Sequence, residues 1–281
     1  MEINRNVLLP NLLTLGNGVC GYFAVTELFK VDTPAEGPAL AFTSPESLSR
    51  AAWLILLGMV FDVFDGKVAR LSGGASALGA ILDSLCDLIT FGLAPALLIL
   101  RLNQGFPPPW QRVVWLLALV YFVGAILRLA RFTAESVPDE DDHLAFKGLP
   151  SPGAAGCVAS LVVFYRYVSA FEQRELHWLT PGMQQALQGG VEWIPVALPF
   201  LGMVLGLTMV SSRLRFPHIG SFVFQRKQSF DLLAWVIFGA IVVALIPEVI
   251  LPAVFLGYLL VIPVRGLFVW MRPRRKDSTV T

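Results

Sequence analysis

Four aspartates lie in two neighbouring apolar stretches of this sequence, at a spacing that brings them together if both stretches are helical. Asp62 and Asp65 are three residues apart, and Asp83 and Asp87 are four residues apart. Each pair then lies on one helix face, and the short connection around Ser72 makes the two helices antiparallel neighbours. An ionised carboxylate at membrane depth is costly, so it should face a cavity or a partner. The spacing therefore predicts a shared acidic site.

The residue types in this stretch favour phosphoryl-group chemistry assisted by metal ions. Four carboxylates repel one another, and two divalent cations would balance their charge; an all-oxygen ligand set favours Mg²⁺ or Mn²⁺ over zinc. Such a pair of cations clamps phosphate oxygens and assists in-line displacement at phosphorus. Gly66 and Ala69 share the helix face and leave room for a substrate, and Arg70 offers a forked cation for a phosphate.

The composition is that of a membrane protein. Of the 281 residues, 56% are hydrophobic, and the mean hydropathy is +0.68. A net charge of +1 gives no electrostatic reason to expect a nucleic acid partner. Cys20, Cys86 and Cys157 lie in apolar segments, at a spacing that fits neither a disulfide framework nor a zinc site.

The apolar segments predict an all-α fold, a polytopic membrane helical bundle of about eight transmembrane helices. The first segment carries Asn11, Thr14 and Asn17 and lacks a small-residue cleavage site, so we expect a retained helix rather than a signal peptide. The polar stretches at about 31–48 and 169–190 predict exposed loops. Only Pro247 and Glu248 separate the last two segments, which fits a tight hairpin or one broken span. The expected spans are about 8–29, 51–70, 76–100, 110–132, 150–168, 192–212, 230–247 and 249–270.

The lysines and arginines predict the orientation of this bundle. Fifteen of the 21 fall on one set of alternating connections and six on the other, which puts both termini in the cytoplasm. The aspartates then lie at the cytoplasmic side of the inner or plasma membrane. We expect residues 1–271 to form a single transmembrane catalytic domain. Residues 272–281 are expected to be a disordered basic cytoplasmic tail near anionic lipid headgroups.

The aspartate run resembles the signature of the CDP-alcohol phosphatidyltransferase family at every position, with eight fixed identities over 26 residues. The run reads Asp62-x-x-Asp65-Gly66-x-x-Ala69-Arg70 and, after eight residues, Gly79-x-x-x-Asp83-x-x-x-Asp87. The family's enzymes are membrane proteins that move a phosphatidyl or similar group from a CDP-linked donor onto an alcohol and release CMP.

This resemblance implies roles for the matching residues. Asp62, Asp65 and Asp83 would hold two divalent cations, Mg²⁺ or Mn²⁺. Asp87 would touch one metal and act as the catalytic general base on the incoming hydroxyl. Gly66, Ala69 and Arg70 would line the CDP end of the donor. The family also suggests a homodimer.

Other stretches resemble phosphatidylserine synthases, which implies CDP-diacylglycerol as the donor and L-serine as the acceptor. One departure is that Thr133 stands where these enzymes commonly have asparagine, which concerns contacts with the acceptor rather than the chemistry. The resembling blocks are Pro10-Asn-Leu-Leu-Thr-Leu-Gly-Asn17, Arg128-Leu-Ala-Arg-Phe132, Phe146-Lys-Gly-Leu-Pro-Ser-Pro152 and Met209-Val-Ser-Ser-Arg213.

The residues themselves fit a serine acceptor and leave rivals open. Arg128 and Arg131 are one turn apart and can aim at one spot, where they would meet a carboxylate or a lipid phosphate, with Lys147 nearby in sequence; all three could instead anchor helix ends. Asn11 and Thr14 share a helix face and could meet the cytidine ring, or could pack between helices.

Three rivals to this reading remain. One has the same chemistry with glycerol 3-phosphate or inositol as acceptor, and another has an archaeal ether-lipid donor. The third is a cation transporter that uses the intramembrane aspartates as a pathway, which predicts metal flux across vesicles and no CMP release.

Overall fold

The described part of the chain is almost entirely helical. The computed structural model describes residues 5–32, 42–72, 76–135, 146–170, 181–211, 215–216, 238–239 and 241–271. Its helices are α1 (Arg5–Phe29), α2 (Pro45–Ser72), α3 (Ala77–Asp87), the π-helix η1 (Leu88–Leu93), α4 (Ala94–Leu102), α5 (Pro108–Glu135), α6 (Ser151–Ser169), α7 (Pro181–Val191), α8 (Ile194–Val210) and α11 (Pro247–Met271).

Four strands of two residues each form two antiparallel pairs outside the helices. In the first pair, β1 (Val31–Asp32) pairs with β2 (Phe42–Thr43). In the second, β3 (Phe146–Lys147) pairs with β4 (Arg215–Phe216). The strands therefore only join the ends of helices, and the expected all-α fold is confirmed.

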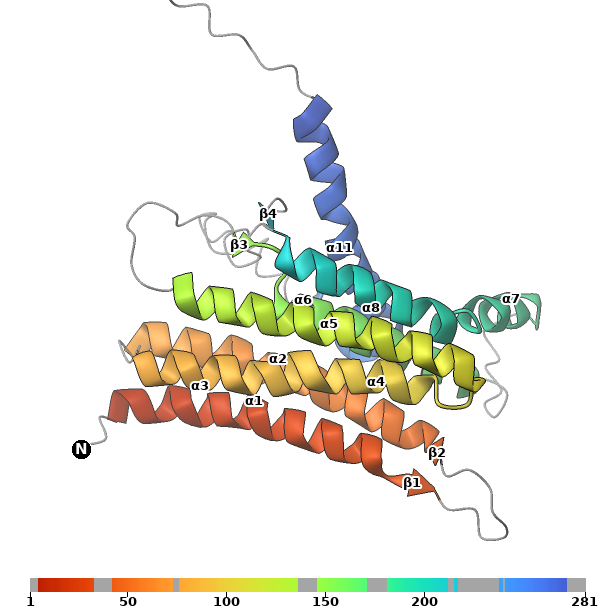
Figure 1. The fold of residues 1–281 in the computed structure, drawn as a ribbon, viewed down its shortest axis with the longest axis horizontal. Coiled ribbons are helices and arrows are strands. Elements are labelled where there is room, and N and C mark those ends of the chain that lie inside the picture. The colour runs from red at the N-terminus through yellow and green to blue at the C-terminus, as the bar shows by residue number, and fades with distance from the viewer. Residues whose placement is uncertain are drawn as a thin grey trace, which may run out of the picture.

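The bundle has α1 on one side and α8 on the other, with α2, the continuous α3–η1–α4 segment and α5 between them (Figure 1). Helix α6 is largely buried and packs against α2, α8 and α11. The C-terminal part of α11 rises away from the other helices (Figure 1). In the described part, five segments are long and apolar enough to cross a membrane: Leu8–Phe29, Pro45–Ser72, Ala77–Leu102, Pro108–Ala134 and Leu187–Val210.

Glycines allow α5 and α8 to approach each other at backbone contact distance. A Cβ added at Gly124 of α5 would lie 2.4 Å from the Gly206 carbonyl oxygen of α8. A Cβ added at Gly206 would lie 2.7 Å from the carbonyl oxygen of Val120. Small residues at a helix crossing gain dispersion contacts that larger ones would prevent, which holds this side of the bundle together.

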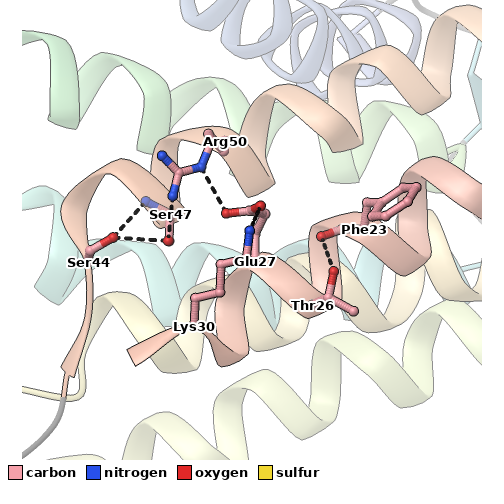
Figure 2. A network of polar contacts seen from close by, with 7 residues as sticks. All are labelled: Phe23, Thr26, Glu27, Lys30, Ser44, Ser47 and Arg50. Atoms are coloured by element: carbon pink, nitrogen blue, oxygen red, sulfur yellow. Dashed lines mark hydrogen bonds and ion pairs between the residues drawn. The ribbon is translucent and has the colours of Figure 1, made fainter. Parts of the chain in front are cut away.

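At the end of the bundle far from the aspartates, a polar network joins α1 to α2 (Figure 2). Glu27 accepts hydrogen bonds from Lys30 on its own helix end and from Arg50 Nε of α2, the latter at 2.8 Å. Arg50 Nη2 also donates to Ser47 Oγ, and the Ser44 hydroxyl caps the start of α2 by accepting from the backbone N–H of Ser47 at 3.1 Å. These contacts fix the outer end of the α1–α2 pair.

Most of the expected membrane spans correspond to helices of the structure. Seven of the expected spans correspond to α1, α2, the α3–η1–α4 segment, α5, α6, α8 and α11. Half of the remaining one, 230–247, lies outside the described residues, and so does the whole tail 272–281. Two expected loops were wrong in part: α7 occupies residues 181–191, and α2 begins at Pro45 rather than near residue 51. Proline suits the first turn of a helix, where no backbone donor is lost, so it starts both helices.

Candidate active site

Helix α1 lies along one side of the acidic site. It packs along α2 and also along α3, whereas α2 and α3 make little direct contact in the described part of the chain. Helix α1 therefore packs against both aspartate-bearing helices, and the expected convergence of aspartates from α2 and α3 is found beside it.

Three of the four aspartates converge in this space. Asp62 of α2 and the α3 residues Asp83 and Asp87 each offer a carboxylate oxygen, and these three oxygens lie within 4.8 Å of one another. Asp87 is the last residue of α3 and only 7% exposed. Like charges this close need a cation between or beside them.

Asp65 lies beside this group but turns toward α1. Its side chain is 5% exposed and lies next to the hydroxyl of Thr14, which itself donates to the Pro10 carbonyl oxygen at 3.1 Å. Its charge still acts on Asp62 and Asp83, so the carboxylate is a neighbour of the cluster. Asp65 therefore lies beside the three converging oxygens but does not belong to their group.

The atoms of the cluster fit a bound metal ion. Among the described residues, Asp65 Oδ2 and Asp83 Oδ1 are buried side-chain oxygens without a hydrogen-bond partner. Buried carboxylate oxygens are normally satisfied by donors or by cations. An all-carboxylate donor set of this kind suits a hard divalent cation such as Mg²⁺ or Mn²⁺.

A polar stripe on α1 faces the aspartates. Asn11 lies against Gly79 of α3, where an added Cβ would come within 3.1 Å of Asn11 Oδ1. Thr14 lies beside Asp65, and Asn17 Nδ2 donates to Asp87 Oδ1 at 2.8 Å. The three stripe residues recur at intervals of three, which keeps them on one helix face.

The residues expected to bind the CDP end of the donor lie at two places. Gly66, Ala69 and Arg70 follow Asp65 in the last turns of α2, and an added Cβ at Gly66 would lie 3.7 Å from Arg70 Nη1. The Arg70 guanidinium thus folds back over Gly66, and the Arg70 side chain is exposed. Asn11 and Thr14 lie on α1, on the side of the aspartates.

Arg128 of α5 reaches the acidic cluster. Its Nη1 donates to Ser151 Oγ at 2.7 Å, and its positive charge acts on Asp62 and Asp87. Ser151 is the fully buried first residue of α6, placed there by Pro150 at the N-cap. A guanidinium is therefore held next to the carboxylates, where an anionic substrate group would have a cation to pair with.

Arg131 bonds to a different partner from Arg128, and Lys147 is described only by its backbone. Arg131 Nη1 donates to the Val210 carbonyl oxygen at the end of α8, at 3.4 Å. Lys147 pairs in β3 opposite Arg215 of β4, and its side chain is outside what the structure describes. Arg128 and Arg131 therefore donate to different partners, although the charge of Arg131 still acts on Arg128.

Two residues of this site were missed as functional candidates. Asn17 ends the block Pro10–Asn17 that resembles phosphatidylserine synthases, but the sequence predicts no role for it, although its spacing from Asn11 and Thr14 places it on the same helix face. Ser151 stands within the block Phe146–Pro152, but no periodic signal in the sequence links it to Arg128, which lies 23 residues away.

A protein-family profile matches the part of the chain that carries this site. The profile of the family described as CDP-alcohol phosphatidyltransferase matches residues 7–201, which run from the first turn of α1 into α8 and include all four aspartates. This range is more than half of the chain, so the match identifies the family.

Individual relatives carry related names. The chain is 33% identical over 173 residues to the CDP-diacylglycerol–serine O-phosphatidyltransferase of Saccharomyces cerevisiae, covering 57% of this chain and 58% of that protein. It is 31% identical over 157 residues to the enzyme of the same name from Bacillus subtilis, covering 56% and 76%. It is 34% identical over 173 residues to the archaetidylserine synthase of Methanothermobacter thermautotrophicus, covering 60% and 64%.

Proposed function

Because this chain belongs to the CDP-alcohol phosphatidyltransferase family, we propose that it transfers a phosphatidyl group from CDP-diacylglycerol to the hydroxyl of L-serine. The products would be phosphatidylserine and CMP. The observation that carries this proposal is the convergence of three carboxylate oxygens within 4.8 Å inside an apolar bundle. The names of the relatives support the choice of serine.

The aspartates divide the work of the reaction between them. The four would hold two divalent cations, Mg²⁺ or Mn²⁺, which supply charge stabilisation for displacement at phosphorus when bound. Asp87 takes the proton of the serine hydroxyl. The serine oxygen then bonds to the phosphorus that carries diacylglycerol, and the bond from that phosphorus to CMP breaks. General-base catalysis of this kind contributes about 10²–10⁴ in rate.

The cationic residues suit the two substrates. L-Serine brings a carboxylate, and Arg128 offers a guanidinium beside Asp62 and Asp87, where the hydroxyl must lie to lose its proton. Arg131 and Lys147 are the further candidates for contact with the acceptor or the lipid phosphate. At the donor end, Gly66, Ala69, Arg70, Asn11 and Thr14 line the space for the CDP group.

The membrane setting follows from the same arrangement. The donor's acyl chains would lie between helices, because the lipid never needs to leave the bilayer. The bias of lysine and arginine supports a cytoplasmic location for both termini and for the aspartates. A homodimer in the inner or plasma membrane completes this proposal.

An acceptor panel tests the proposed reaction. Purified protein with CDP-diacylglycerol and Mn²⁺ or Mg²⁺ is assayed for CMP release with serine, glycerol 3-phosphate and inositol in separate reactions. Serine is expected to give the fastest release. If serine releases no more CMP than the other two alcohols, the proposed acceptor is wrong; if none releases CMP while vesicles take up metal ions, a transporter explains the aspartates instead.

An ether-lipid donor is the second candidate, because one relative is an archaetidylserine synthase. The chemistry at phosphorus would be the same, and only the apolar groove between the helices would differ. Replacing CDP-diacylglycerol by CDP-archaeol in the serine reaction discriminates the two. We expect the ester-linked donor to give the higher kcat/KM, and a preference for the ether-linked donor would overturn that assignment.

A further inference from the structure

Asn17 is a buried amide that bonds directly to the last aspartate of the cluster. Its side chain is 0% exposed, and its Nδ2 donates to Asp87 Oδ1 at 2.8 Å across the contact between α1 and α3. The opposite orientation of the amide would place its oxygen against a carboxylate oxygen, which is repulsive. The Asn17 amide therefore donates a hydrogen bond to Asp87 without bringing a charge of its own.

Thr90 holds the backbone of Asn17 from the other side. It lies in η1, three residues beyond Asp87, and its Oγ1 donates to the Asn17 carbonyl oxygen at 2.9 Å. A π-helical turn is wider than an α-helical one and commonly marks a functional site. Here α5 supports the turn, since the fully buried Tyr121 hydroxyl donates to the Phe91 carbonyl oxygen at 2.8 Å.

Glycines close the helices tightly around Asn17 and Thr90. An added Cβ at Gly58 of α2 would lie 2.9 Å from Asn17 Oδ1 and 2.6 Å from Thr90 Cγ2. An added Cβ at Gly21 of α1 would lie 2.3 Å from Thr90 Oγ1. Asn17 is thus held by α2 and α3 at its side chain and by η1 at its backbone carbonyl.

The position of the Asp87 carboxylate depends on such confinement. The last torsion of an aspartate side chain is broad and close to two-fold, so packing alone sets the carboxylate plane weakly. A short hydrogen bond to one oxygen from a confined donor removes that freedom. Groups that orient a metal ligand in this way typically change metal affinity or activity by about 10–100-fold when removed.

We propose that Asn17 is a positioning residue, which fixes the orientation of the Asp87 carboxylate toward Asp62 and Asp83. This inference rests on the proposed role of Asp87 as a metal ligand and general base. It adds a residue of the first helix to the machinery, outside the aspartate signature.

Metal binding without substrates tests this inference. The full-length wild type and the variants Asn17→Leu, Asp87→Asn and Asn17→Leu/Asp87→Asn are titrated with Mn²⁺, and free Mn²⁺ is measured by its electron paramagnetic resonance signal. Leucine keeps the approximate volume of asparagine and removes the donor. We expect Asn17→Leu to weaken Mn²⁺ binding about tenfold.

The double variant separates positioning from general loss of packing. If Asn17 acts through Asp87, the Asn17→Leu change should cost little more Mn²⁺ affinity once Asp87 is already asparagine. Asn103→Leu is the matched control, since Asn103 is a second buried asparagine, 1% exposed, that bonds to Ile99 and Trp110 at the far end of the bundle. It should leave Mn²⁺ affinity unchanged.

A second variant keeps the test decisive if Asn17→Leu does not fold. Thr90→Val removes only the hydroxyl that holds the Asn17 carbonyl, and should weaken Mn²⁺ binding in the same direction by about twofold to fivefold. Unchanged affinity in the folded variants, an equal loss with and without Asp87, or a wild type that binds no Mn²⁺ would each overturn the inference. Coupled Mn²⁺ losses in a protein that releases no CMP would instead refute the proposed function alone.

Discussion

At the level of single residues, the three converging aspartates carry more negative charge than the one neighbouring arginine can neutralise. Two carboxylate charges separated by no more than 4.8 Å repel by about 3.5 kcal/mol or more at an effective dielectric constant of 20. Asp62, Asp83 and Asp87 contain three such pairs, and Arg128 brings a single positive charge to them. The electrostatics therefore favour a bound cation at this site.

Asp87→Asn tests the role of the general base. The amide keeps the size of the side chain but cannot accept the serine proton, so we expect turnover to fall by about 10²–10⁴. The measurement is CMP release under saturating substrates. Glu46→Gln removes a carboxylate from the exposed first turn of α2, far from the site, and should retain full turnover. Near-full turnover in Asp87→Asn would show that another group takes the proton.

Removal of the metal should lower the stability of the wild type. A ligand that binds only the folded state, at a concentration 100 times its Kd, stabilises that state by about 2.7 kcal/mol. We therefore expect Mn²⁺ to raise the Tm of purified wild-type protein and EDTA to reverse the shift. In Asp83→Asn, which loses one of the three converging carboxylates, most of this shift should disappear. A shift of the same size in wild type and variant would place the ion elsewhere.

At the level of elements, the sequence predicted which helices exist better than how they meet. Apolar length predicted seven of the described helical spans, because hydrocarbon thickness sets their length. It did not predict that α1 packs against both α2 and α3, because that depends on glycine contacts such as Gly18 against Cys86, where an added Cβ would lie 2.8 Å from Sγ. Motif spacing identified the aspartates, whereas the bond from Arg128 to Ser151 is visible only in three dimensions.

The crossing of α5 and α8 gives a stability prediction at this level. Gly206→Ala places a methyl group 2.7 Å from the Val120 carbonyl oxygen and should push the helices apart, with a loss of about 1–3 kcal/mol. Gly257→Ala is the matched control, because an added Cβ there meets nothing within 4 Å. Thermal unfolding in detergent should show a lower Tm for the first variant and no decrease for the second. Equal values would mean that the close approach contributes little.

At the level of the whole molecule, the proposal requires the aspartates and the CDP donor to share the cytoplasmic leaflet. The three native cysteines are buried, so a cysteine introduced at an exposed position can be labelled selectively. Arg70→Cys lies at the aspartate end of α2, and Gly105→Cys lies at the other end of the bundle. In intact cells, an impermeant maleimide should label only Gly105→Cys, and permeabilisation should expose Arg70→Cys. The reverse pattern would invert the topology and put the site on the wrong face.

The most direct test of the central claim is the synthesis of phosphatidylserine by purified wild-type protein from CDP-diacylglycerol and isotopically labelled L-serine, with and without Mn²⁺. The account predicts labelled lipid and CMP in equal amounts, formed only when the divalent cation is present. Labelled lipid at the same rate in excess EDTA, or CMP without labelled lipid, would contradict metal-assisted transfer to serine at the aspartate cluster.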